Sequence, residues 1–399
     1  MKAVFTLYKN AFGGLSTPAW MLALVMLVNR SGTMVIPFLS IYLTGELGFS
    51  IQQAGYILSI FGLGSMVGSY LGGYLSDKIG HFWVQCSSLV LSGLLFFWVV
   101  QVRSFHWLGL SIFILSIIAE SLRPANISSV ASYAKPENIT RAFSLNRMAI
   151  NLGFSIGPAL GGLLAGISFK WLFIADGFTC IGAGLLFFLY FRTRKGHEAH
   201  KSKEALTQQE LRKPHKDRLF LAFVLLATSY AVVFFQLFGT LPLYYREVYA
   251  LSEGKIGGLL GINGFVIFAF EMILVYLIGQ RFRSHVLIIA GVLLNGFGFV
   301  FLNLMPGPMW LIPGMVMLSF AEILVLPFLS TLVVARAGTR NRGAYMGVYT
   351  LSFSLAHVLA PYLGTHLVAN YGFDTLWWAS GALSIFTALG MWVVVRKME

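Results

Sequence analysis

Charged side chains inside long apolar stretches are the residues of this sequence most able to do chemistry. Glu120 and Arg123 lie in one such stretch, and Arg30, Glu271 and Glu322 lie in three others. A charge in the middle of a bilayer costs at least about 2.5 kcal/mol, so one that persists there usually faces a cavity or a partner. Carboxyls in such places can bind and release protons, and arginines can hold a carboxylate.

Transmembrane helices are the elements that must position these charges. Of the 399 residues, 57% are hydrophobic and only 11% are charged, a composition that excludes a soluble protein. A helix that crosses the hydrocarbon core needs about 20 apolar residues, which leaves room for about twelve spans and no large extramembrane domain. We therefore predict an all-α integral membrane protein with twelve transmembrane helices.

Apolar runs separated by polar breaks give the predicted spans. Those in the first half are residues 17–44, 51–76, 82–102, 105–132, 142–167 and 171–192. Those in the second half are residues 218–247, 255–279, 284–305, 308–335, 343–369 and 374–396. The polar segment 193–217 predicts a cytoplasmic linker between an N-terminal six-helix bundle, 1–192, and a C-terminal one, 218–399. The first sixteen residues have no cleavage-site pattern, so we expect no signal peptide to be removed.

The basic residues indicate the orientation and account for the net charge of +13. Of the 28 Lys and Arg residues, 21 fall on one set of loops and termini and four on the opposite loops. Cytoplasmic loops retain basic residues, so we expect both termini on the cytoplasmic side of a bacterial inner membrane. Such a topology signal removes the case for nucleic acid as a partner. Cys86 and Cys180 lie in apolar runs, which excludes a disulfide framework or a Cys-based zinc site.

The two halves of the chain repeat each other at an offset near 203 residues. The matched pairs are Glu120 with Glu322, Pro124 with Pro327, Pro158 with Pro361 and Gly161 with Gly364. Two parallel repeats of six helices are typical of transporters that rock around a site near the bilayer midplane.

Two signatures make the resemblance to a known family specific. Residues 73–81, GYLSDKIGH, resemble the major facilitator signature G-x-x-x-D-[RK]-x-G-[RK], from which only His81 departs. Residues 151–162, NLGFSIGPALGG, resemble the Gly-Pro signature associated with the family's antiporters. Within this superfamily the chain is most similar to bacterial twelve-span drug:proton antiporters of the multidrug-resistance type. A weaker similarity is to proton-coupled oligopeptide symporters, but residues 27–30, LVNR, do not match their E-x-x-E-R motif.

The resemblance implies that spans one and four lie side by side at a central cavity. Glu120 and Arg123 share one helix face because they are three residues apart. We therefore expect Arg30 and Arg123 to flank Glu120. In one transporter state the two cations lower the proton affinity of Glu120, and in another state they release the carboxyl from this effect. A permanent structural ion pair is the alternative.

The carboxyls of the second half have no cation obviously beside them apart from His357. Glu322 repeats Glu120 and is our first candidate for a proton carrier there, and Glu271 is the second. A carboxyl in apolar surroundings keeps its proton more readily than one in water. The alternative is a protonated carboxyl that donates to a backbone carbonyl. Asp176, near the outer end of span six, is expected to be a solvated end residue.

Other polar side chains are expected to orient a substrate in a cavity otherwise walled by Phe and Met. They are Asn151, Asn263, Gln236, Tyr244 and His357, together with Arg30 and Arg123. Such a cavity suits lipophilic or cationic compounds better than sugars. For His357, polar packing within a helix is the alternative.

The facilitator signature predicts a gating loop after span two. Gly73 and Gly80 permit close helix approach and a tight turn around Asp77 and Lys78. In the family such a carboxylate acts as a latch, with a contact that forms in one transporter state and breaks in the other. A surface loop that only obeys the positive-inside rule is the alternative.

The Gly-Pro signature predicts close packing of span five. Gly153, Gly157 and Gly161 are spaced four apart on one helix face, and Pro158 can bend the helix. Small residues at this spacing let helices pack backbone to backbone. Packing alone can be their entire role.

The leading hypothesis is a proton-driven antiporter that exports a lipophilic, drug-like or cationic small molecule by alternating access. The alternative is a proton symporter that imports a small peptide, organic anion or other nutrient, and a lipid flippase is a further possibility on this fold. We find no metal-cluster pattern, nucleophile turn or phosphate loop, so an enzyme is not expected, nor a cofactor. The expected partners are a small-molecule substrate, protons and the lipid bilayer, with the protein as a monomer.

Overall fold

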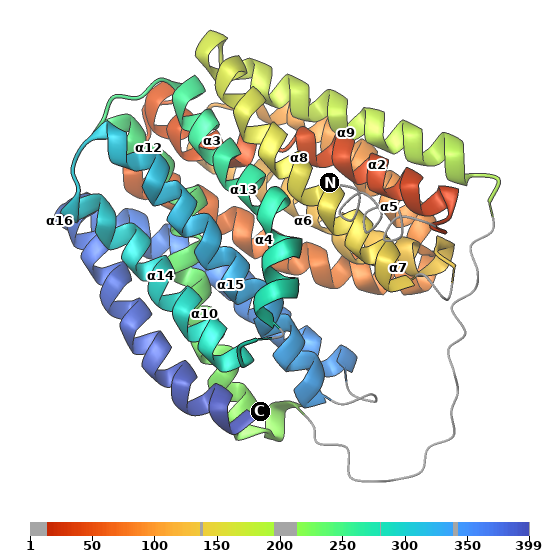
Figure 1. Cartoon of the computed structure of the whole chain (residues 1–399). Coiled ribbons are helices and arrows are strands. Elements are labelled where there is room, and N and C mark those ends of the chain that lie inside the picture. Colours follow the sequence, from red (N-terminus) through yellow and green to blue (C-terminus); the bar gives the residue numbers. More distant parts are fainter. Residues whose placement is uncertain (1–13, 136–138, 195–213, 280, 338–341, 399) are drawn as a thin grey trace, which may run out of the picture. The chain divides into compact units, whose positions relative to one another are not determined.

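The computed structural model describes residues 14–135, 139–194, 214–279, 281–337 and 342–398, which form helices and no β-strand. Most of the predicted linker, residues 195–213, lies outside the described residues. The helices of the first half are α2 (Thr17–Ser31), α3 (Val35–Ile41), a π-helix (Tyr42–Glu46), α4 (Ile51–Ile79), α5 (His81–Val99), α6 (Phe105–Glu120), α7 (Leu122–Tyr133), α8 (Ile139–Ile167) and α9 (Lys170–Phe191) (Figure 1).

The second half of the chain continues the helical pattern. Its helices are a 3-10 turn (Pro214–Lys216), α10 (Arg218–Phe234), α11 (Gln236–Gly239), α12 (Leu241–Glu247), α13 (Glu253–Gly279), α14 (Ser284–Leu304), a second 3-10 turn (Pro308–Trp310), α15 (Leu311–Ala337) and α16 (Arg342–Met398).

Eleven helical segments of the described chain are long and apolar enough to cross a membrane. The last of them, Tyr345–Met398, turns at Gly372, where φ is 83° and ψ is 170°. That left-handed conformation favours glycine and divides α16 into two arms, 342–371 and 373–398. The predicted all-α membrane fold with two spans in this stretch is therefore confirmed.

Several spans are interrupted near a proline. Span one breaks between Ser31 and Val35, and span four breaks at Ser121, between α6 and α7. Pro37 and Pro124 follow these breaks by a few residues. A proline has no N–H, so it cannot donate a hydrogen bond to the carbonyl four residues before it. The Thr33 carbonyl therefore receives no helical bond from Pro37, and the Glu120 carbonyl receives none from Pro124. The second break puts the Glu120 side chain at a helix end.

The chain packs as two compact units. Unit 1 comprises residues 1–34, 64–157 and 170–204, and unit 2 comprises residues 35–63, 158–169 and 205–399. The division falls inside α4 and α8, which contribute to both. These packing units differ from the two six-helix bundles expected from the internal repeat, and those bundles stay a prediction.

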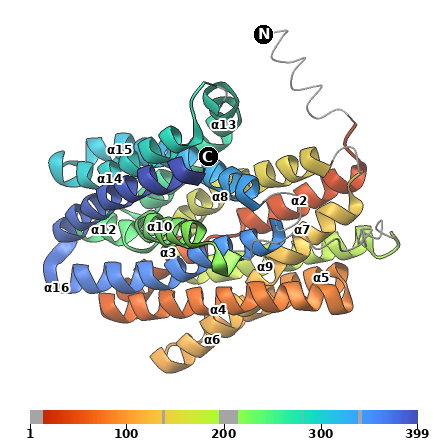
Figure 2. The same ribbon diagram turned by 90° about the horizontal axis from the view of Figure 1, so that it is seen from below.

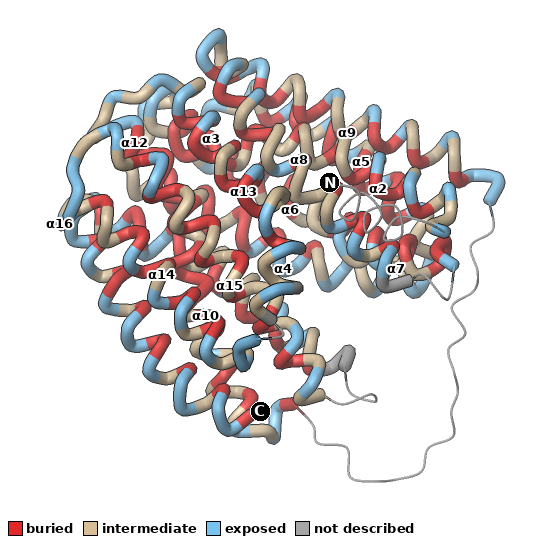
Figure 3. The backbone as a smooth tube through the Cα atoms, in the orientation of Figure 1, coloured by how far each residue is buried: buried red, intermediate tan, exposed pale blue. Residues whose placement is uncertain are grey.

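Apolar side chains from α2, α5 and α9 fill the core of unit 1. Leu22, Leu89 and Phe187 are fully buried there, and the rings of Phe187 and Phe191 lie 4.8 Å apart. Figure 3 shows that the long helices carry buried residues along one side and exposed residues along another. Exposed Leu, Phe and Trp side chains are numerous, as expected for helices that face lipid.

In unit 2, α10, α14, α15 and both arms of α16 pack side by side (Figures 1 and 2). A charged cluster ties one end of them together. Asp217 caps α10 by accepting from the Phe220 N–H at 3.1 Å, and its carboxylate accepts from Arg336 Nε at 3.0 Å and from the Tyr345 hydroxyl at 3.1 Å. Burial disfavours the charged form of Asp217, but the bonds from Arg336, Phe220 and Tyr345 outweigh it and hold its pKa below the usual value.

Unit 2 also joins the first part of α4 to α16. A Cβ added to Gly62 would lie 2.6 Å from the His357 carbonyl oxygen, so only glycine permits this approach. The Ser59 hydroxyl donates to the Val358 carbonyl at 2.9 Å. Residues far apart in sequence are therefore held together by direct backbone contact.

Candidate functional site

The intramembrane charges of unit 1 lie together, as the sequence predicts. Arg123 Nη2 is 3.4 Å from Glu120 Oε2. The Glu120 side chain is only 12% exposed, whereas that of Arg123 is 54% exposed. The ion pair therefore joins a carboxylate that is largely removed from solvent to a guanidinium that is accessible.

Arg30 completes this cluster from α2. Its charge interacts with those of both Glu120 and Arg123. Its guanidinium carbon lies 5.4 Å from the centre of the Phe154 ring, and its Nε is buried with no hydrogen-bond partner among the described residues. Arg30 therefore has both an aromatic neighbour and the charge of Glu120 to stabilise its guanidinium.

Close approach of α8 makes room for Arg30. A Cβ on Gly153 would lie 2.5 Å from the Arg30 Cβ and 3.0 Å from its backbone carbonyl carbon. One on Gly157 would lie 2.9 Å from the Thr33 carbonyl oxygen. These two glycines of the Gly-Pro signature thus pack α8 against the end of α2. Any role of Gly153 and Gly157 in transport, beyond this packing contact, stays a prediction.

The rest of the Gly-Pro signature belongs to unit 2. Pro158 and Gly161 are buried in α8, and the next residue, Gly162, packs on α13. A Cβ on Gly162 would lie 2.9 Å from the Gly257 Cα, and one on Gly257 would lie 2.3 Å from the Pro158 carbonyl oxygen. Here α8 and α13 meet backbone to backbone.

Asp176 is not the solvated end residue expected from the sequence. It is 2% exposed, and its carboxylate accepts a hydrogen bond from the Met34 N–H at 3.0 Å. The break after α2 leaves that N–H outside the helical ladder, where it is shared between the α9 carboxylate and the Gly32 carbonyl oxygen, 2.7 Å away. Beside it, the Asn29 amide lies 3.4 Å from Cys180 Sγ. The rule that intramembrane charges have partners also applies to Asp176. Applied to Asp176, this rule predicts a buried carboxylate with a partner.

The carboxyls of unit 2 have a different setting. Glu322 lies inside the continuous helix α15 and interacts electrostatically with Tyr230, whose side chain is 1% exposed. Glu271 is buried in α13. The Tyr230 hydroxyl is buried without a hydrogen-bond partner among the described residues, so it acts on Glu322 through its electrostatics and not through a direct bond. The structure therefore surrounds Glu322 differently from Glu120.

Two predicted cavity amides make specific bonds between helices of unit 2. Gln236 donates from Nε2 to the Ala360 carbonyl at 3.0 Å, and its Oε1 accepts from the Thr240 hydroxyl at 2.8 Å. Asn263 donates to the Ser319 hydroxyl at 3.1 Å. Both amides are buried. Asn151 lies half-buried in α8 of unit 1.

The two predicted aromatic candidates lie within unit 2. Tyr244 is buried, and its hydroxyl is 3.4 Å from both the Leu302 carbonyl and the Tyr249 hydroxyl. His357 stacks on Phe235, with ring centres 4.0 Å apart and planes 15° apart. The contacts of Tyr244 and His357 fit packing as well as substrate binding.

The gating-loop residues lie at the end of α4 in unit 1. Asp77 and Lys78 are exposed and fall in the last helical turn, slightly earlier than the loop position expected. Gly80 has φ of 90°, a value that favours glycine, and it makes the tight turn into α5. Gly73, one turn before Asp77, is half-buried. The Lys78 ammonium lies 5.9 Å from the centre of the Tyr74 ring.

The described residues contain no group of three or more His, Cys, Asp or Glu side chains that could hold a metal ion. The candidate functional groups are thus intramembrane carboxyls, arginines and amides on helices of two units. The Major Facilitator Superfamily model matches residues 20–361. The chain belongs to the major facilitator superfamily. Its members are transporters, and the long apolar helices of this chain are the spans of such a facilitator.

Relatives of this facilitator come from several bacteria. The MFS-type transporter YttB of Bacillus subtilis (strain 168) is 26% identical over 371 residues, which cover 89% of each chain. The Na(+), Li(+), K(+)/H(+) antiporter of Planococcus maritimus is 25% identical and covers 90% of this chain and 91% of its own. Quinolone resistance protein NorA of Staphylococcus aureus is 29% identical over 176 residues, 44% of this chain and 42% of its own.

A solved structure extends the likeness of this facilitator over nearly the whole fold. A POT family transporter in complex with 5-aminolevulinic acid has a TM-score of 0.80 at 17% identity, covering 97% of this chain and 98% of that one. At this identity the likeness shows the fold alone.

Proposed function

We propose that this facilitator is a proton-coupled antiporter that exports lipophilic, drug-like or cationic small molecules. In this proposal Glu120 and Glu322 bind and release the coupling protons, with Glu271 as a further carrier. Glu120 carries the proposal, because it lies 12% exposed at a break in span four beside Arg123 and interacts with Arg30.

The arginines give Glu120 two stable states. While both cations are close, the carboxylate is favoured; if Arg123 moves away, the buried carboxyl favours the protonated form. Arg123 is exposed enough to move, and Arg30 keeps one cation in place. A substrate cation that displaces Arg123 would compete with the proton for the same carboxylate, which is the coupling that an antiporter requires.

The packing of unit 2 supports alternating access. Under the proposed orientation, with both termini in the cytoplasm, residues 35–63 and 158–169 are the outer parts of spans one, two and five. They pack with second-half helices through Ser59, Gly62 and Gly162. In the proposal these contacts close the outer side while Asp77 belongs to the latch for the opposite state.

The names of two relatives agree with this proposal. One is a cation/proton antiporter and another is a quinolone resistance protein. We further propose that the protein lies in a bacterial inner membrane and acts as a monomer. In this proposal two six-helix bundles, 1–192 and 218–399, are joined by the linker 193–217.

Proton-coupled import is the second candidate, and Arg30 favours it. Its buried Nε has no hydrogen-bond partner among the described residues, and a substrate carboxylate would satisfy it. In that case Asn151, Asn263, Gln236, Tyr244 and His357 orient a peptide or organic anion instead of a lipophilic cation.

Transport into proteoliposomes under imposed pH and voltage gradients tests the proposal. Dyes, cationic drugs and dipeptides are presented in turn. An antiporter moves its substrate against the direction of proton flow, and a symporter moves it with the protons. Movement of every substrate down its own gradient, with no response to pH, would contradict proton coupling altogether.

A further inference from the structure

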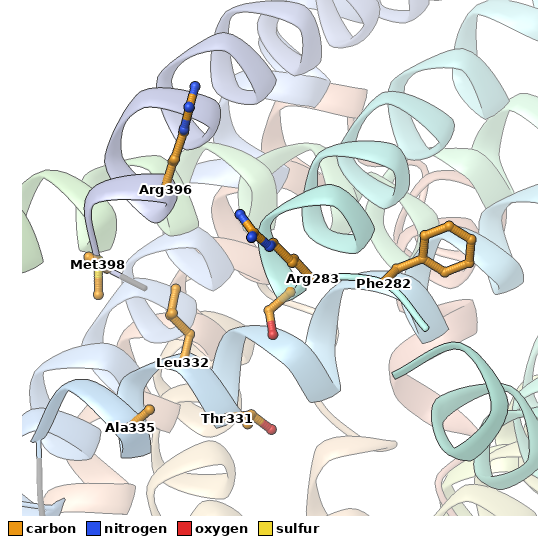
Figure 4. Close-up of a pocket in the computed structure, with 8 residues that line it drawn as sticks. Phe282, Arg283, Thr331, Leu332, Ala335, Arg396 and Met398 are labelled. Atoms are coloured by element: carbon orange, nitrogen blue, oxygen red, sulfur yellow. The ribbon is translucent and has the colours of Figure 1, made fainter. Parts of the chain in front are cut away.

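A cavity of about 820 Å³ opens at one end of unit 2. It lies where α14 begins and where α15 and the second arm of α16 end. Figure 4 shows Arg283 at the start of α14, Arg396 near the end of α16, and Thr331 and Leu332 along α15. No residue of the proposed transport site lines it.

Two of the described residues that line this cavity are charged, and both are arginines. Arg283 and Arg396 are exposed, and none of the described lining residues is acidic. Within the described part of the chain, neither arginine forms an ion pair with a carboxylate. Two guanidinium groups at one cavity repel each other, so an anion bound between them would lower the energy of both.

The first turn of α14 also favours a bound anion. Arg283 is the N-cap of this 21-residue helix, and no side chain caps the helix there. The N–H groups of the first turn point out of the helix start and carry partial positive charge. A cation at this end is unfavourable unless an anion lies beside it. The half-buried Ser284 hydroxyl is a further donor in the cavity wall.

Apolar side chains form the rest of the lining. Phe282 is exposed, Leu332 and Met398 are buried, and Ala335 completes the apolar part. The cavity therefore offers cationic donors and a hydrocarbon surface to one ligand. A small soluble anion needs only the donors, whereas an amphiphile uses both.

The position of the cavity agrees with an amphiphile. Both α14 and α15 are long and apolar enough to span a membrane, and the cavity lies at their ends. The ends of spanning helices lie at the depth of lipid headgroups. Basic pockets between transmembrane helices at this depth bind anionic headgroups.

We propose that this cavity is a binding site for the phosphate group of an anionic phospholipid. Arg283, Arg396 and the first turn of α14 hold the phosphate, and Phe282, Leu332 and Met398 contact the apolar part of the lipid. A bound lipid would link the start of span nine to the ends of spans ten and twelve.

Native mass spectrometry of the full-length protein in detergent tests the proposal. The protein is titrated with phosphatidylglycerol and, separately, with zwitterionic phosphatidylcholine. The wild type should retain phosphatidylglycerol at concentrations at which it releases phosphatidylcholine. An Arg283→Gln/Arg396→Gln double variant should bind phosphatidylglycerol at least about tenfold more weakly, the size expected when two basic contacts to a headgroup are lost.

Two control variants distinguish lipid binding in this cavity from attraction to surface charge and from misfolding. Arg103→Gln removes an exposed arginine that does not line the cavity and should leave lipid binding unchanged. Arg283→Lys/Arg396→Lys keeps the charge and should keep most of the affinity, and thermal unfolding of the Gln and Lys variants verifies that each one folds.

Three results would overturn the proposal. One is equal phosphatidylglycerol binding by the wild type and the double Gln variant. A second is an equal loss in Arg103→Gln, which would indicate general surface charge. The third is displacement of the lipid by inorganic phosphate at a similar concentration, which would make the ligand a soluble anion.

Discussion

Glu120 and Glu322 occupy corresponding places in the two halves of the chain, 202 residues apart, yet their surroundings differ. Glu120 ends a helix and pairs with Arg123, which lies three residues later. Glu322 lies inside α15, and the residue that corresponds to Arg123 at an offset of 203 is Leu326. Glu322 interacts electrostatically with the buried Tyr230.

The helices that pack beside these carboxyls differ in the same way. Gly153 lies against Arg30, and its counterpart 203 residues later is Ala356, which packs in an apolar cluster with Ala231 and Ala360. At this position of the second half a methyl group is accommodated among small apolar side chains. We propose a division of labour in which Glu120, paired with Arg123, is held as a carboxylate, while Glu322, which has Leu326 at the position that corresponds to Arg123, takes up the proton.

The largest expected effect comes from removing the carboxyls. Glu322→Gln and Glu120→Gln should each abolish proton-driven transport, a loss of at least about a hundredfold in the initial rate. Glutamine keeps the shape and polarity but cannot carry a proton. The measurement is substrate flux into proteoliposomes under a pH gradient, with thermal unfolding to verify the fold. Full coupling in both variants would refute the assignment of proton carriers.

An exchange of cations between the halves should move the pH dependence in opposite directions. A cation beside a carboxyl favours its charged form. Arg123→Leu should therefore raise the pH of half-maximal transport, and Leu326→Arg should lower it, each by about one pH unit. Leu326→Met tests the effect of a changed side chain without charge. The division of labour fails if the two variants shift the profile in the same direction.

Replacing a glycine should measure how tightly α8 packs against Arg30 in the first half. Gly153→Ala should destabilise the protein by roughly 1–2 kcal/mol, because the new methyl group meets Arg30 and its backbone. Thermal unfolding in detergent measures the change. Gly182→Ala, in α9, is the matched control, since an added Cβ there meets nothing within 4 Å. Equal stability of both variants would show that α8 can shift away from Arg30.

An effect on stability of similar size concerns the helix ends and depends on pH. Asp217 has a lowered pKa in the fold, so its bonds stabilise the protein above the unfolded value of about 3.9 and are lost as the pH falls through the folded value. Asp217→Asn should cost about 2 kcal/mol at pH 7, and the difference from the wild type should shrink below about pH 4.

The first half supplies a neutral counterpart to this ionic cluster. The Ser16 hydroxyl donates to the Tyr133 carbonyl at 3.2 Å and so also joins the start of span one to the end of span four. Ser16→Ala should have a smaller effect, without pH dependence between about pH 4 and 8. A stability difference for Asp217→Asn that stayed constant down to about pH 3 would contradict an ionic origin of the stabilisation.

The spans and the Arg30–Glu120–Arg123 cluster could be predicted because each rests on a strong local constraint. Hydrocarbon demands a long apolar helix, and a charge within it demands a partner. The partner of Asp176 could not be predicted in this way. The Met34 N–H points out of the helical ladder only because the helix breaks before it, and α9 reaches that break only in the folded chain.

The sequence by itself determined the helical membrane fold, the internal repeat and the short list of charges on which transport can depend. These follow from composition and spacing, which act locally along the chain. The tertiary structure alone decided which partner each charge has: Arg123 for Glu120, Tyr230 beside Glu322, and Met34 for Asp176. Such partners depend on backbones that approach within a few ångströms across distant segments, and no local pattern fixes that approach.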